Sequence, residues 1–257
     1  FIISVSTGLL EVGFYCQKIG KLPTDFVNFV EDTSSKGTIL VSFGSNADWD
    51  YAPDELLSLV VEALNRLSQY RIVFAYNGEK KRIRSIGQHI KITAWAPQVE
   101  ILQHNKTALF ISHGGQKRLV LAVCLKVVSV KETICGGVPA VYIPLFAEQA
   151  HNGELARKAG FAETLHKNRL SSDLIEKVVR KVAEATRYKK AILRLREFYL
   201  DRIMPSLDLA EFFARRSVKT SPNAPFFKRK GMFISMFNHI YFLHFIVLLL
   251  LMCLLYF

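Results

Sequence analysis

The chain carries the run Thr38-Ile39-Leu40-Val41-Ser42-Phe43-Gly44-Ser45, in which mostly apolar residues end at a glycine and a serine. A short apolar run that is closed by such residues is typical of a buried β-strand. Pro53 follows, and the apolar residues after it recur at the spacing of a helix. They are Leu56, Leu57, Val60, Val61, Leu64 and Leu67. The run and the segment after it therefore predict a strand-to-helix unit.

Further apolar runs repeat this pattern, each separated from the next by helical or polar sequence. They cover residues 71–76, 89–93, 108–112 and 140–143. The alternation predicts the α/β fold class, with a parallel sheet that helices cover on both faces. After Gln149 the pattern predicts helices over residues 150–159, 171–185, 188–200 and 207–217. Residues 1–32 are expected to form a connector that ends in a short helix after Pro23.

The C-terminal end is strongly apolar. From Met232 to Phe257 there is no Lys, Arg, Asp or Glu, and only His244 interrupts the apolar run from Ile240 onward. Because about 20 apolar residues suffice for one bilayer crossing, we expect a transmembrane helix over residues 235–257. A buried core helix is the alternative, and the length, the terminal position and the lack of a polar face disfavour it.

The net charge of +12 is concentrated in one region. Residues 166–230 hold 17 Lys and Arg against 7 Asp and Glu, a net charge of +10. This basic excess, with the linker over residues 221–234, precedes the apolar segment, where it can meet anionic lipid head groups. We therefore expect a membrane lipid partner and no nucleic acid, since a nucleic-acid interpretation rests on charge alone. The positive-inside rule places the globular part in the cytosol.

The cysteines and the termini give weaker indications. Cys16, Cys124, Cys135 and Cys253 have no metal-ligand spacing, so we expect no metal site, and they do not indicate a redox compartment. The chain has no initiator Met and no signal peptide, so we expect that residue 1 is not the start of a natural precursor. Asn105-Lys106-Thr107 is the only acceptor triplet for N-glycosylation.

Residues suited to nucleotide-sugar chemistry are concentrated between Trp95 and Gln149. They are Trp95-Ala96-Pro97-Gln98, His104, His113-Gly114-Gly115-Gln116-Lys117, Ser129, Glu132, Gly136-Gly137-Val138-Pro139 and Pro144-Leu145-Phe146-Ala147-Glu148-Gln149. A Trp ring at a strand end can stack a base, and a nearby Gln can pair with its edge. Two glycines after a His let the backbone approach an anion while the His donates to it.

Each of these elements alone has a plainer interpretation. Trp95 is of a type more often found in a core, and His113 could cap a turn. Ser129 and Glu132 have the spacing of a helix capping box. An exposed Glu148-Gln149 pair usually has no role. The indication of function lies in the order of the whole set.

That order resembles the signature of the UDP-glycosyltransferases, most nearly the animal UDP-glucuronosyltransferases. The resemblance covers nearly the whole chain, from about Val12-Gly13 through the apolar C-terminal segment. It implies the GT-B fold, in which two Rossmann-like domains face each other. Residues 33–220 would be the C-terminal, donor-binding domain. The resemblance also implies a single-pass protein of the endoplasmic reticulum with a lumenal globular part, which opposes the orientation that the charge predicts.

The resemblance implies a role for each matching residue. Trp95 would stack the uracil and Gln98 would contact the uridine. Ser45, His113, Gly115 and Ser129 would hold the diphosphate, and Lys117 could also meet phosphate. Glu132 would bind the ribose hydroxyls, and Glu148 with Gln149 the sugar. The implied reaction transfers glucuronic acid or a hexose, with inversion, from UDP-glucuronic acid or UDP-glucose to a small hydrophobic acceptor. The UDP-sugar is a co-substrate, and no cofactor is expected.

The chain departs from the family pattern in three ways. It has no counterpart of the N-terminal domain that carries the general base, so we nominate no catalytic residue and expect the chain alone to be inactive. Lys117 and Glu148 stand where Asn and Asp are commoner. Residues 118–128 separate Lys117 from Ser129, which would otherwise be adjacent.

The insertion leaves two functional alternatives. If residues 118–128 continued a helix, Ser129 would move about 16 Å along its axis, too far to share a diphosphate with His113. The two halves of the site can meet only if the insertion loops out. The alternative to an enzyme is a catalytically inactive, membrane-bound fragment or variant that associates with intact family members as a homo- or hetero-oligomer.

Overall fold

The computed structural model describes residues 15–44, 47–115, 129–219 and 241–256. It divides into two compact units. One comprises residues 16–201 and contains the sheet. The other comprises residues 1–15 and 202–257, of which the described elements are helices α8 (Ser206–Lys219) and α10 (Phe242–Tyr256).

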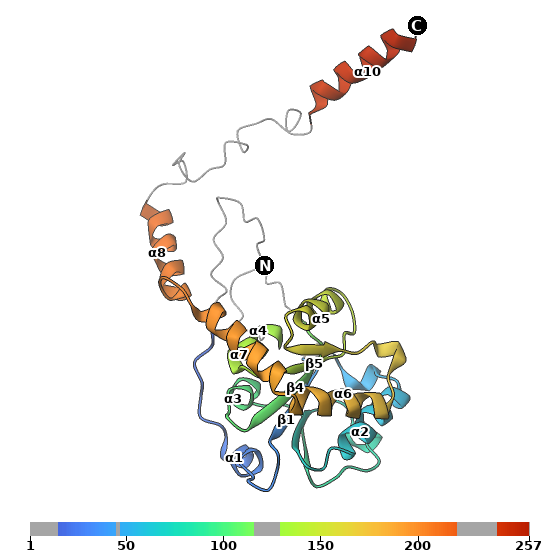
Figure 1. Ribbon diagram of the computed structural model, residues 1–257, viewed down its shortest axis with the longest axis vertical. Coiled ribbons are helices and arrows are strands. Elements are labelled where there is room, and N and C mark those ends of the chain that lie inside the picture. Colours follow the sequence, from blue (N-terminus) through green and yellow to red (C-terminus); the bar gives the residue numbers. More distant parts are fainter. Residues whose placement is uncertain (1–14, 45–46, 116–128, 220–240, 257) are drawn as a thin grey trace. The chain divides into compact units, whose positions relative to one another are not determined.

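Six parallel strands form the sheet in the order β3-β2-β1-β4-β5-β6. The neighbouring strands β1, β4 and β5 are labelled in Figure 1. The strands are β1 (Thr38–Ser42), β2 (Arg71–Ala75), β3 (Ile90–Thr93), β4 (Thr107–Ser112), β5 (Ala140–Tyr142) and β6 (Ala162–Thr164). The order reverses between β1 and β4, so the connections leave their C-terminal ends in opposite directions. Ligands of open α/β sheets bind at such a switch point.

The sheet unit also contains helices α1 (Thr24–Val30), α2 (Asp54–Asn65), α3 (Gln98–Leu102), α4 (Ser129–Gly136), α5 (Gln149–Lys158), α6 (Ser172–Glu184) and α7 (Thr186–Leu200). Short 3₁₀ turns lie at Trp49–Tyr51, Lys80–Arg82 and Lys167–Arg169. Side chains of successive strand residues point to opposite faces, so Ile39 and Val41 of β1 pack in one core and Leu40 in another. The first core includes residues of α2 and α6, and the second those of α1, α3 and α7.

The predicted α/β class and parallel sheet are confirmed, and the predicted strands end within one or two residues of those observed. Strand β6 was not predicted from the sequence. Ala162-Glu163-Thr164 is short and not apolar throughout, and its strand conformation depends on pairing with β5, where Ala140 faces Ala162 and Tyr142 faces Thr164. Such a strand is specified by its partner more than by its own periodicity.

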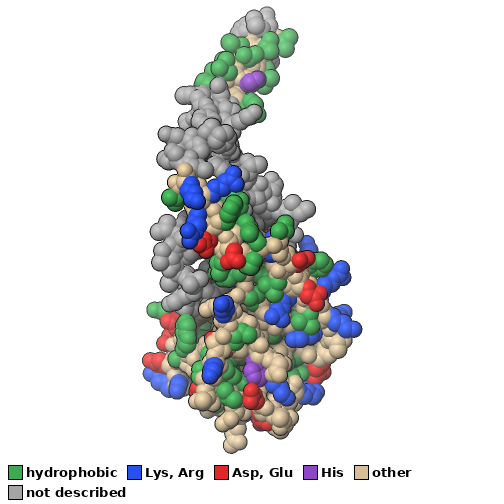
Figure 2. Space-filling model, turned by 90° about the vertical axis from the view of Figure 1, so that its left-hand side faces the viewer, with side chains coloured by type: hydrophobic (Ala, Val, Ile, Leu, Met, Phe, Trp, Pro, Cys, Tyr) green, Lys and Arg blue, Asp and Glu red, His purple; other side chains and the backbone are tan. Residues whose placement is uncertain are grey.

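The expected transmembrane helix over residues 235–257 is not found. Helix α10 has 15 residues, about 22 Å at the rise of an α-helix, whereas the hydrocarbon core is about 30 Å thick. In the described ranges, no helix is both long and apolar enough to cross a membrane. Hydrophobic side chains cover α10 (Figure 2). The whole linker over residues 221–234 and the start of the expected crossing lie outside the described residues.

Candidate functional site

The candidate residues gather beyond the C-terminal ends of four strands. Gly44 follows β1, Trp95 follows β3, His113 follows β4, and the segment from Leu145 to Gln149 follows β5. Ser45, Lys117 and the insertion over residues 118–128 lie outside the described residues. The remaining predicted site residues are all described.

Trp95 is a surface residue, with 69% of its area exposed. The interpretation of this ring as part of the core is therefore wrong. It follows β3 in a short turn, in which the Thr93 hydroxyl donates to the Trp95 carbonyl oxygen at 2.8 Å. Pro97 then caps α3, and Gln98 is its first residue. An exposed indole beside a helix start offers an aromatic face for stacking.

Gln98 and Glu132 connect the two halves of the candidate site. The Gln98 amide nitrogen Nε2 donates a hydrogen bond to Glu132 Oε2, from α3 to α4. The other carboxylate oxygen, Oε1, is buried and has no hydrogen-bond partner in the described part of the chain. Burial raises the pKa of Glu132 to about 7, while the Gln98 hydrogen bond and the Lys131 charge act against that shift. The Glu132 side chain thus binds Gln98 and does not close a capping box on Ser129.

The loop after β4 places His113 against glycine backbone. A Cβ atom on Gly115 would lie 2.2 Å from His113 Nε2, and one on Gly44 would lie 3.0 Å from its Cε1. Gly44 has φ +75° and Gly114 has φ +73°, which other residues rarely adopt. The Ser112 hydroxyl lies 3.3 Å from His113 Nδ1. Larger residues at these glycines would displace the imidazole.

Asn152 of α5 also holds this loop, a role that was not predicted from the sequence. Its side chain is buried, and Nδ2 donates to the Gly114 carbonyl oxygen at 3.1 Å. Its position three residues after Gln149, on the inward face of a predicted helix, was the available signal.

Glu148 and Gln149 have different environments. Glu148 is exposed at the start of α5, whereas Gln149 is 3% exposed. Gln149 Oε1 accepts hydrogen bonds from the backbone N–H of Leu145 at 2.8 Å and of Phe146 at 3.2 Å. Ala147, which follows Phe146 in this loop, has φ +54°, an uncommon value for a residue with a Cβ atom. Gln149 therefore shapes the loop that presents Glu148.

Ser129 is buried at the start of α4, with its carbonyl oxygen accepting from the Thr133 hydroxyl at 2.7 Å. The contacts of α4 show that the two sequence halves meet. Glu132 of the later half accepts a hydrogen bond from Gln98 of the earlier half, and a Cβ atom on Gly114 of the earlier half would lie 3.3 Å from the Tyr142 ring of the later half. Gln98 and Glu132 are therefore in contact although residues 118–128 lie between them in the sequence.

A disulfide joins Cys16 to Cys135, and the sequence did not reveal it. The two cysteines are 119 residues apart, and their Cα atoms are 5.5 Å apart in the fold. Cys135 lies three residues after Glu132, so the disulfide anchors the C-terminal turn of α4 to the segment that precedes α1. Disulfides persist mainly in oxidising compartments.

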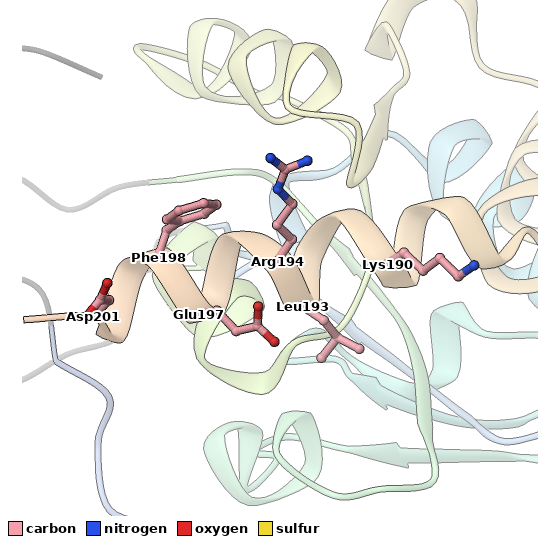
Figure 3. Close-up of a pocket in the computed structure, with 6 residues that line it drawn as sticks. All are labelled: Lys190, Leu193, Arg194, Glu197, Phe198 and Asp201. Atoms are coloured by element: carbon pink, nitrogen blue, oxygen red, sulfur yellow. The ribbon is translucent and has the colours of Figure 1, made fainter.

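A concave surface lies along α7 and includes none of the predicted site residues. It has a volume of about 670 Å³ and is lined by Lys190, Leu193, Arg194, Glu197, Phe198 and Asp201. Arg194 and Phe198 point to the same side of the helix (Figure 3), with the guanidinium carbon 5.8 Å from the ring centroid.

Known proteins are similar to this chain in sequence and in fold. Residues 9–220 match the family model described as UDP-glucoronosyl and UDP-glucosyl transferase. UDP-glucuronosyltransferase 1A6 of Mus musculus is 31% identical over 201 residues, which are 78% of this chain and 35% of that protein. A UDP-glucuronosyltransferase of Pleuronectes platessa is 32% identical over 197 residues, 77% of this chain and 38% of that protein. The chain thus spans little more than a third of the length of these relatives.

The solved structures that resemble it are glycosyltransferases. Os79 from O. sativa in complex with UDP gives a TM-score of 0.60 at 22% identity, covering 75% of this chain and 43% of that one. The glycotransferase of kitacinnamycin gives 0.59 at 19% identity, covering 78% and 46%. At these identities the likeness shows the fold alone, which is the Rossmann-like half of a GT-B enzyme. With the match of its family model over residues 9–220, the chain belongs to the UDP-glucuronosyl and UDP-glucosyl transferase family.

Proposed function

We propose that this chain forms the donor half of a glycosyltransferase that moves glucuronic acid or a hexose from a UDP-sugar to a small lipophilic acceptor. The observation that carries the proposal is the Gln98 to Glu132 hydrogen bond, which leaves Glu132 Oε1 buried without a donor among the described residues. A buried acceptor of this kind is costly unless a ligand group donates to it. Ribose hydroxyls have that chemistry.

The arrangement suggests a role for each group in donor binding. The exposed Trp95 ring stacks the uracil, and Gln98 lies within the same turn of chain to meet the uridine. His113, the N–H groups of the glycine loop and Ser129 face the diphosphate. Glu148 meets the sugar, while Gln149 holds the loop. The names of the mouse and flatfish relatives support glucuronic acid as the sugar.

The chemical contribution of this half is to the leaving group. When the bond between the sugar carbon and the phosphate oxygen breaks, negative charge grows on UDP. Donors that are already fixed around the diphosphate stabilise that charge without reorganising. His113 is held in this way between Gly44 and Gly115. We assign no general base to the described residues and propose that the chain binds UDP but does not turn over alone.

We further propose that the sheet unit resides in the lumen of the secretory pathway. The Cys16 to Cys135 disulfide supports this placement, because cytosolic thiols are kept reduced. It favours the orientation implied by the family resemblance over the one implied by charge.

Titration of the full chain with UDP tests the proposal. We expect saturable UDP binding, and a Trp95→Ala variant should lose about 10-fold in affinity, since base stacking on an aromatic ring contributes about 1–3 kcal/mol. Phe198→Ala is a matched control, because Phe198 is also exposed but lies on α7. Equal UDP affinity in the wild type and the Trp95→Ala variant would contradict the proposed site.

A further inference from the structure

Tyr142, the last residue of β5, lies between two segments of the donor site. It is fully buried, and a buried phenol needs a partner for its hydroxyl group. That hydroxyl donates to Thr133 Oγ1 at 3.0 Å, and the Thr133 hydroxyl donates to the Ser129 carbonyl oxygen at 2.7 Å. Tyr142 is therefore linked through α4 to the start of that helix. Burial raises the pKa of the phenol, so it remains a neutral donor.

The ring of Tyr142 contacts the other segment. A Cβ atom on Gly114 would lie 3.3 Å from Tyr142 Cγ and Cδ1, so the glycine backbone rests against the ring. Gly114 is also held by the hydrogen bond from Asn152 Nδ2 to its carbonyl oxygen. The Tyr142 ring and the Asn152 amide thus both contact Gly114.

These contacts matter because the chain itself does not join the two segments closely. His113 to Gly115 and Ser129 are separated by residues 116–128, so their spacing is not set by a short covalent connection. Binding one diphosphate from both sides requires a fixed spacing. Tyr142 spans that space with a side chain that has only two rotatable torsions, and it touches Gly114 with its ring and α4 with its hydroxyl.

We propose that Tyr142 is a positioning residue for donor binding, acting through Gly114 on the loop of His113 and through Thr133 on Ser129. The inference rests on the proposed function, because it concerns the same UDP site. It concerns the hydrogen bond between Tyr142 and Thr133 specifically, beyond the general contribution of a buried ring to stability.

Isosteric variants test the hydrogen bond in the full chain, purified in detergent. Tyr142→Phe removes only the hydroxyl, and Thr133→Val removes its partner. We expect each to weaken UDP binding by about 3- to 10-fold, the usual effect of losing one hydrogen bond. The double variant should lose no more UDP affinity than the weaker-binding single variant, because both substitutions break the same hydrogen bond. Thr133→Ser, which keeps a hydroxyl, should lose less UDP affinity than Thr133→Val.

Tyr70→Phe is the matched control. Tyr70 is also buried, with its hydroxyl 3.4 Å from Glu184 Oε1, but it precedes β2 at the opposite end of the strands. Removing the Tyr70 hydroxyl should leave UDP affinity unchanged. The proposal is overturned if Tyr142→Phe binds UDP with wild-type affinity, or if Tyr70→Phe loses as much UDP affinity as Tyr142→Phe. It is also overturned if the affinity losses of Tyr142→Phe and Thr133→Val add in the double variant.

Hydrogen exchange of the protein without ligand separates this proposal from the proposed function. In Tyr142→Phe the amides of α4 should exchange several-fold faster than in the wild type, while those of α2 should not change. If the wild type fails to bind UDP, the proposed function is wrong, and the exchange rates still decide whether Tyr142 positions α4. Unchanged exchange rates in α4 would overturn the positioning role of Tyr142, whether or not the wild type binds UDP.

Discussion

Gln98 and Glu132 are 34 residues apart in the sequence, and a hydrogen bond between their side chains joins α3 to α4. One residue belongs to the half of the signature before residues 118–128 and the other to the half after them. Their contact brings an exposed Trp turn and a buried carboxyl to the same edge of the sheet. These two residues of the candidate donor site therefore meet in the fold although the sequence between them is interrupted.

The buried Glu132 carboxyl makes the stability of the chain depend on pH. Burial raises its pKa from the ordinary 4.5 to about 7 in the folded state, so the folded protein holds a proton that the unfolded chain releases. The extra proton adds about 3 kcal/mol to the free energy of unfolding. This contribution of Glu132 is fully present below about pH 4.5 and is lost as the pH rises through 7. Urea unfolding between pH 4.5 and 8 measures it. Glu132→Gln should flatten that dependence; parallel curves for the two proteins would contradict the assignment.

Glu132 should also make nucleoside binding depend on pH, in the opposite direction. An ionised carboxylate accepts hydrogen bonds from two hydroxyls better than the acid does. Uridine is the suitable ligand because it lacks the titrating phosphate. Its affinity should rise by about 10-fold as the pH passes through 7, and Glu132→Gln should bind weakly at every pH. Calorimetric titration at pH 6 and pH 8 decides this, and a pH-independent wild type would refute it.

Gly115 has a prediction of its own, because its backbone leaves no room for a side chain beside His113. An added Cβ would lie 2.2 Å from Nε2, so Gly115→Ala must displace the imidazole. We expect UDP affinity to fall by at least about 10-fold, as expected for a lost hydrogen bond to a charged group. Gly20→Ala is the control, since its Cβ would meet only the end of the Glu100 side chain. Wild-type affinity in Gly115→Ala would show that His113 does not contact the diphosphate.

The Cys16 to Cys135 disulfide should stabilise the sheet unit. Cross-linking residues that are 119 positions apart restricts the unfolded chain, which is worth about 2–4 kcal/mol. Cys16→Ser should therefore unfold at lower urea concentration, and reductant should lower the midpoint of the wild type to a similar value. Cys253→Ser is the control because Cys253 is exposed and unpaired in the structure. A reductant-insensitive wild type would argue against the disulfide and the lumenal placement together.

Asn105 provides a separate test of compartment. It is exposed in the turn before β4, at the end of the strands opposite the candidate site. The Thr107 hydroxyl of the same triplet is buried and bonded to the Ile101 carbonyl oxygen, so the glycan would have to be attached before that contact forms. Expression in animal cells followed by endoglycosidase digestion should shift the mobility of the wild type and not of Asn105→Gln. No shift would count against lumenal synthesis.

The sequence was most informative where periodicity or residue order is local. The apolar run of β1 and the helical spacing after Pro53 predicted their elements, because burial on the two faces of a strand, or along one face of a helix, repeats within a few residues. The order of residues from Trp95 to Gln149 predicted the family that the comparisons then showed. The interruption at residues 118–128 was also evident in the sequence, but the sequence did not predict whether residues on its two sides would be in contact.

Tertiary structure alone decided the contacts between distant residues. The pairing of Cys16 with Cys135, the bond of Gln98 to Glu132 and the link of Tyr142 to Thr133 leave no periodic trace in the chain. The residue types were readable in each case, but the partners depend on how the parallel strands order themselves and on which helices cover them. The residue order thus specified the residue types of the candidate site, whereas the reversal of strand order between β1 and β4 and the packing of α4 beside α3 placed Gln98 against Glu132.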